Sequence, residues 1–73
     1  METVKFVCVD SNASEIWFLM RLNQPMGLMI SSYRSRAHVL NVECYYHEKL
    51  IDPTDTPGSL GIRNLDQVMV YHL

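Results

Sequence analysis

The 73-residue sequence lacks the features that mark membrane and exported proteins. It has no apolar run approaching the roughly 20 residues that cross a bilayer, so we expect no membrane association. The short apolar stretch after Glu2 and Lys5 lacks the basic start and the small-residue cleavage site of a signal peptide. We therefore expect a protein of the nucleus or the cytoplasm.

Basic residues and cysteines are also few. Six Lys and Arg stand against eight Asp and Glu, and the only basic cluster is Arg34 and Arg36 beside His38. Such a cluster is too small to follow a phosphate backbone, which excludes nucleic acid as the expected partner. Cys8 and Cys44 lie far apart in apolar segments without Cys-x-x-Cys spacing, a pattern that favours buried, reduced thiols.

No residue pattern predicts a catalytic or metal site. Residues three apart in a strand point to opposite faces, so Cys44 and His47 cannot form a nucleophile–base pair unless the strand ends before His47. A thiol on the inward face is also a poor nucleophile, because burial raises its pKa. The histidines and cysteines lack the paired spacing of zinc ligands. We expect no enzyme activity, no metal and no cofactor.

Two alternating segments open the chain and are followed by a helical one. Residues 4–9 and 15–22 predict a hairpin around an Asp-Ser-Asn-Ala-Ser turn, in which Asn12 tolerates positive φ. Pro25 is predicted to occupy the first position of a helix, with Asn23 or Gln24 as its N-cap residue. A helix of about twelve residues then presents one apolar face, formed by Met26, Met29, Ile30, Tyr33 and Ala37.

Short strands complete the pattern. They are predicted at residues 42–46, 49–51 and 67–73, with a short 3-10 turn opened by Pro57 in the intervening loop. The order, with no repeat and no linker, predicts one domain over residues 1–73. Its class is α+β: a β-grasp roll, in which one helix crosses a mixed sheet. Other small α+β rolls share this order.

Short motifs along nearly the whole chain resemble one family. They are Val4-Lys5-Phe6, Ser14-Glu15-Ile16-Trp17-Phe18, Ser32-Tyr33-x-x-Arg36, Thr56-Pro57-x-x-Leu60-Gly61, Asp66 and Val70-Tyr71. In this order and spacing, apart from a short deletion between Val39 and Val42, they resemble SUMO, a member of the ubiquitin-like superfamily. The resemblance implies the ubiquitin-like β-grasp fold.

The end of the sequence departs from SUMO. SUMO proteins continue to a Gly-Gly tail that is joined to a target lysine, whereas this sequence stops at Tyr71-His72-Leu73. The resemblance then implies a SUMO-like domain that binds proteins of the SUMO pathway, such as the SUMO-conjugating enzyme, without being conjugated. Three alternatives stay open: a modifier whose Gly-Gly tail lies beyond Leu73, a constitutive subunit of a larger complex, and a self-associating domain.

The resemblance also implies a groove between the second strand and the helix, where SUMO receives a hydrophobic strand with acidic flanks. Main-chain bonds would carry such strand addition. Leu19, Leu28 and Ile30 replace most of the basic rim, so we expect only a weak preference for acidic flanks. The predicted groove residues are Phe18, Met20, Arg21 and Met29.

Gly61 and Asp66 fall where SUMO domains contact the conjugating enzyme, so the resemblance implies such a contact here. The acidic residues that usually precede Asp66 are replaced by Arg63, Asn64 and Leu65. A role for Asp66 in capping the turn before the last strand is the alternative.

Strand alternation leaves many large apolar side chains outside the core. We assign one set of alternating strand residues, which includes Leu50, to the core, so the residues between them should face solvent. The solvent-facing residues are then Val7, Val9, Trp17, Leu19, Tyr45, Met69 and Tyr71. Contiguous apolar patches usually mark binding sites, and Trp and Tyr often anchor interfaces. We predict that this sheet face binds a protein; the alternative is that these residues only stabilise cross-strand pairs.

Overall fold

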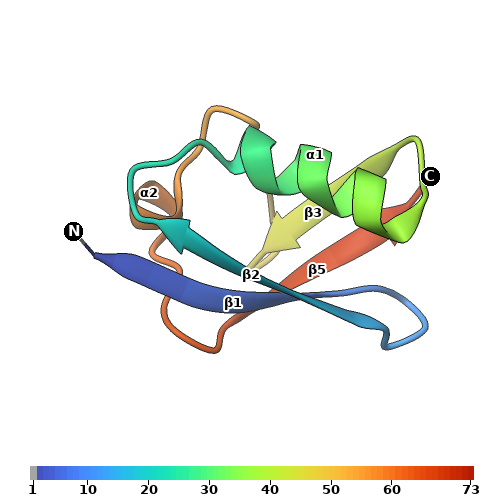
Figure 1. Cartoon of the computed structure of the whole chain (residues 1–73), viewed down its shortest axis with the longest axis horizontal. Helices are drawn as coiled ribbons and strands as arrows, with labels where there is room; N and C mark the ends of the chain where they lie inside the picture. The colour runs from blue at the N-terminus through green and yellow to red at the C-terminus, as the bar shows by residue number, and fades with distance from the viewer. Residues whose placement is uncertain (1) are drawn as a thin grey trace.

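The computed structural model describes residues 2–73, which form one mixed sheet crossed by one long helix (Figure 1). The elements are β1 (Thr3–Val9), β2 (Glu15–Arg21), α1 (Met26–Ala37), β3 (Val42–Tyr46), β4 (Lys49–Leu50), α2 (Pro57–Leu60) and β5 (Gln67–His72). The strand order is β2-β1-β5-β3-β4, with β1 and β5 parallel and the other neighbours antiparallel. This is the predicted β-grasp roll, and the predicted bounds agree to within one residue.

The β1–β2 turn uses the predicted side-chain chemistry at a shifted position. Asp10 Oδ1 accepts hydrogen bonds from the backbone N–H groups of Asn12 (2.8 Å) and Ser14 (2.9 Å). The positive φ expected at Asn12 falls instead on Ala13, at 63°. Because Asp10 binds the backbone N–H groups of both residues that flank Ala13, Ala13 is the residue that adopts the left-handed conformation.

Helix α1 begins differently from the prediction. Pro25 is the N-cap residue with extended backbone, and no side chain caps the helix, neither Asn23 nor Gln24. The N–H groups of the first two helical residues instead donate to the carbonyl oxygens of Asp55 and Pro53, over 2.7 and 2.9 Å. A distant loop therefore satisfies the groups that a local cap would have bound.

Helix α2 is an α-helical turn, whereas a 3-10 turn was predicted. The Leu60 N–H donates to the carbonyl of Thr56, four residues earlier, over 3.0 Å. Thr56 and Ser59 form a reciprocal capping box, and Pro57 takes the first helical position, where its missing N–H costs nothing. Gly61 ends the turn at φ 77°.

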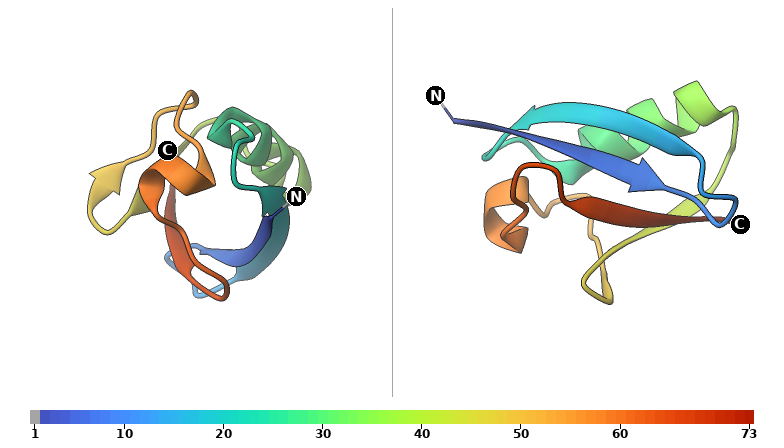
Figure 2. Two further views of the ribbon diagram at one scale, coloured as in Figure 1. Left: turned by 90° about the vertical axis from the view of Figure 1, so that its left-hand side faces the viewer. Right: turned by 90° about the horizontal axis from the view of Figure 1, so that it is seen from below.

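The core lies between α1 and the sheet face beneath it (Figures 1 and 2). Helix α1 buries Met26, Met29 and Tyr33, which confirms the predicted apolar face. The buried cluster consists of Val4, Phe6, Cys8, Met20, Met26, Met29, Tyr33, Cys44, Tyr46, Ile51, Ile62, Val68 and Val70.

Strand β4 presents the opposite residue from the one predicted. Tyr45 and Leu50 are paired, so both side chains lie on the sheet face away from α1, and Leu50 is 51% exposed. Ile51 enters the core in its place, at 4% exposure. The inward assignment of Leu50 is therefore wrong. The two-residue turn His47-Glu48 fixes this register, and a shift of one residue exchanges the faces.

Candidate protein-interaction surface

The sheet face opposite α1, called the open face below, carries a row of side chains across all five strands. Glu15 is paired with Val9, Val9 with Met69, Met69 with Tyr45, and Tyr45 with Leu50. Since paired residues share a face, these five side chains lie side by side. Apart from Glu15, the row is apolar or aromatic.

Most of the residues predicted for this face are exposed there. Tyr45 is half-buried. The large apolar side chains exposed on the open face, between 36% and 69%, are Trp17, Leu19, Leu50, Met69 and Tyr71. Leu50 is the member that strand alternation missed, because only its pairing with Tyr45 reveals its direction. Together these residues form an apolar patch of the kind that marks binding sites.

Val7 is the exception among the predicted contacts. It is paired with Trp17 on one side and Gln67 on the other, so it belongs to the open face, yet it is only 2% exposed. Its position in a central strand between two larger side chains covers it. The expected solvent exposure of Val7 is therefore wrong, whereas its contact with a partner stays a prediction. In this structure Val7 packs beside Trp17, its pairing partner in β2. The ammonium group of Lys5 lies 5.4 Å from the Trp17 ring centroid.

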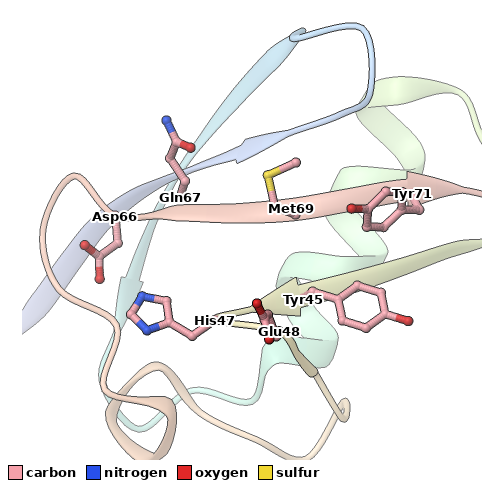
Figure 3. Close-up of a pocket in the computed structure, with 7 residues that line it drawn as sticks. All are labelled: Tyr45, His47, Glu48, Asp66, Gln67, Met69 and Tyr71. Carbon is pink, nitrogen blue, oxygen red and sulfur yellow. The ribbon is translucent and has the colours of Figure 1, made fainter.

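A hollow of about 580 Å³ lies in the open face between β5 and the β3–β4 turn (Figure 3). The rings of Tyr45 and Tyr71 meet edge to face, with their centroids 5.6 Å apart. The Tyr45 hydroxyl donates to Glu43 Oε1 over 3.1 Å, and this bond raises the pKa of Tyr45. The lining residues are Tyr45, His47, Glu48, Asp66, Gln67, Met69 and Tyr71.

Gly61 and Asp66 come together around one buried tyrosine. The Tyr46 hydroxyl lies 2.6 Å from Asp66 Oδ2 and 3.2 Å from the Gly61 carbonyl oxygen. Asp66 Oδ2 also accepts from the Arg63 N–H over 2.9 Å. The bonds from Tyr46 and Arg63 hold the pKa of Asp66 below its usual value. Asp66 thus closes the turn before β5, and its contact with a conjugating enzyme stays a prediction.

The predicted groove between β2 and α1 is a depression of about 220 Å³. Met20 and Met29 are buried in its floor, Phe18 is half-buried, and Arg21 is exposed. The lining residues are Phe18, Leu19, Met20, Gln24, Leu28, Met29 and Ser32. Arg21 does not line this depression.

The edge of β2 along this groove is partly occupied. Arg36 Nη1 donates to the Trp17 carbonyl over 3.0 Å, and the guanidinium lies 5.0 Å from the Phe18 ring centroid. The Arg21 N–H donates to Gln24 Oε1 over 2.9 Å, and the Gln24 N–H donates to the Arg21 carbonyl over 3.2 Å. Since backbone groups in a strand alternate in direction, the backbone N–H and C=O of Leu19 point to the same edge as those of Trp17 and Arg21. An added strand would have to compete with Arg36 for the Trp17 carbonyl.

The thiols are buried in the core. Burial raises the pKa of both, that of Cys44 to about 11, which makes them poor nucleophiles at neutral pH. His47 lies in the exposed β3–β4 turn and stacks on the Tyr46 ring, at 4.2 Å between centroids. Within residues 2–73 no group of three His, Cys, Asp or Glu could hold a metal ion. The helices of that range are too short or too polar to cross a membrane.

No protein-family model and no curated protein matches this chain. Its structure does match solved ones over nearly its full length. A ubiquitin of Caldiarchaeum subterraneum has a TM-score of 0.89 at 16% identity, covering 99% of this chain and 95% of that one. A structure described as "Molecular Mimicry of SUMO promotes DNA repair" has a TM-score of 0.78 at 15% identity, covering 96% and 91%. Such identities establish the fold alone, and the chain has the ubiquitin-like β-grasp fold found in these ubiquitin-like and SUMO-like structures.

Proposed function

We propose that this chain is a non-covalent, SUMO-like protein-interaction module that acts in or near the SUMO pathway and binds its partner through the open face. The observation that carries the proposal is the set of exposed apolar side chains on that face, which are Trp17, Leu19, Leu50, Met69 and Tyr71. Two of them, Met69 and Tyr71, also line the hollow. A small domain gains no stability by exposing such side chains to water, whereas an interface uses them as anchors.

The distribution of buried and exposed groups supports a binding role rather than a chemical one. Both thiols are buried, and their raised pKa values keep them protonated at neutral pH. The polar groups that line the hollow, such as Glu48 and Gln67, lie beside aromatic side chains rather than beside a nucleophile. Ubiquitin-like folds generally serve as modifiers or binding modules, and the proposed role is of that kind.

The test is an NMR amide-shift titration of the labelled chain with unlabelled SUMO-conjugating enzyme. We expect shifts at the open-face positions of β3 and β5, centred on Tyr45, Met69 and Tyr71. Tyr71→Ala should weaken binding about tenfold or more, because one aromatic anchor contributes about 1.4 kcal/mol or more. Trp17 is a poorer choice for substitution, since it also covers Val7.

Leu40→Ser is the matched control. Leu40 is 80% exposed in the loop between α1 and β3, so this variant removes an exposed apolar side chain away from the open face. It should leave binding unchanged. Shifts confined to the groove between β2 and α1 would contradict the proposed surface. An absence of shifts at high micromolar enzyme would exclude that partner and remove the reason for placing the chain in the SUMO pathway.

A further inference from the structure

The hollow in the open face has two chemically different ends. Tyr45, Met69 and Tyr71 line one end, where two phenol rings and a thioether present apolar surface (Figure 3). The β3–β4 turn and the start of β5 form the other end, which is polar and contains His47, Glu48, Asp66 and Gln67. A side chain with a long apolar stem and a polar head therefore matches the hollow better than a purely apolar one.

The charge at the polar end is negative. The lining includes the carboxylates of Glu48 and Asp66 and no Lys or Arg. Asp66 is held by Tyr46 and by the backbone of Arg63, whose positive side chain also acts on it. Within residues 2–73 the Glu48 carboxylate makes no hydrogen bond or ion pair, so it is available to a ligand.

The two lysines of the chain do not neutralise this end. Lys49 pairs with Asp55 over 2.8 Å, and Lys5 lies over the Trp17 ring. The hollow therefore presents its negative charge to whatever partner covers the open face. Charge complementarity then requires a cation on the partner.

The backbone of Glu48 is also in a conformation that side chains rarely adopt. His47 and Glu48 have φ values of 48° and 67°, as a tight two-residue hairpin turn requires. Glycine or asparagine is the usual residue at such positions. The turn therefore fixes the backbone of Glu48 at the edge of the hollow, which Glu48 lines.

We propose that the hollow receives an arginine side chain from the partner protein, with the aliphatic stem on Met69 and the guanidinium between the tyrosine rings and the Glu48 carboxylate. Arginine fits better than lysine because its planar guanidinium both stacks on aromatic rings and pairs with a carboxylate in a fork. This inference rests on the proposed function, since it names the chemistry of the segment that the open face binds.

The experiment uses three short probes and the full chain. The tripeptides acetyl-Leu-Arg-Leu-amide, its citrulline analogue and its glutamate analogue are titrated separately into labelled protein and followed by amide shifts. Citrulline keeps the shape of arginine and removes the charge. We expect the arginine peptide to shift the amides of Glu48, Gln67 and Met69 and to bind about fivefold more tightly than either analogue.

Two variants locate the charge that selects arginine. Glu48→Gln should abolish the preference for arginine over citrulline. Glu15→Gln removes a carboxylate at the β2 end of the open-face row, outside the hollow, and should retain the preference. Equal binding of arginine and citrulline, an unchanged preference in Glu48→Gln, or no shifts with any peptide would each overturn the arginine site. None of these results would disprove binding of a protein to the open face, which the enzyme titration tests separately.

Discussion

Replacing Glu48 by glycine should stabilise this protein while removing its arginine selectivity. Glu48 has φ 67°, in the left-handed region, where a side chain costs about 1–2 kcal/mol. Glycine removes that cost but loses more backbone freedom on folding, which offsets about 0.5–1 kcal/mol. We therefore expect Glu48→Gly to raise the free energy of unfolding by about 0.5–1 kcal/mol. In a domain of this size that corresponds to a rise in Tm of about 2–8 °C.

The assay is thermal and urea unfolding of Glu48→Gly beside two other variants. Ala13→Gly is the matched control for backbone conformation, because Ala13 has φ 63° in the β1–β2 turn. It should give a similar gain in stability without affecting peptide binding. Glu48→Gln is the control for charge: it keeps the side chain and its backbone cost, so its stability should stay near that of the parent chain.

The reasoning would be refuted by a Glu48→Gly variant that is no more stable than the parent while Ala13→Gly is stabilised. That result would mean that the Glu48 side chain makes a stabilising contact that outweighs the cost of its backbone conformation. If Glu48→Gly instead gains stability and keeps its preference for arginine over citrulline, the backbone account stands and the arginine site fails.

Three further substitutions test other parts of the structure. Arg36→Ala should raise the affinity for a neutral β-branched peptide about two- to fivefold by calorimetry, because it frees the Trp17 carbonyl at the cost of one exposed hydrogen bond; weaker binding would show that Arg36 helps to hold the strand. Tyr46→Phe should lower the free energy of unfolding by about 1 kcal/mol at pH 7 and by less near pH 3. The bond from Tyr46 lowers the folded-state pKa of Asp66, so its contribution is present above the unfolded pKa of about 3.9 and is lost as pH falls through the folded value. Val7→Ala should cost about 1.5–3 kcal/mol in urea unfolding, as for a buried residue, and a cost near zero would mean that Val7 is exposed in solution.

Local patterns in the sequence were sufficient to place every strand and helix. Asp10 shapes its turn through hydrogen bonds to nearby backbone groups, and Pro57 begins α2 through its fixed φ. The spacing of Met26, Met29 and Tyr33 places them on one face of α1. Such signals do not depend on the rest of the chain. For the same reason the β-grasp order and most of the open face could be predicted.

Contacts between distant segments decided the rest. The pairing of Tyr45 with Leu50 turned Leu50 outward, and flanking strands covered Val7, because register and neighbouring side chains are set by the assembled sheet. The carbonyl of Asp55 replaced a local cap on α1. The bond between Tyr46 and Asp66 spans 20 residues, and no spacing rule could have predicted it. The sequence by itself therefore determined which elements form and which faces are apolar, whereas the tertiary structure decided which of those residues stay exposed for a partner.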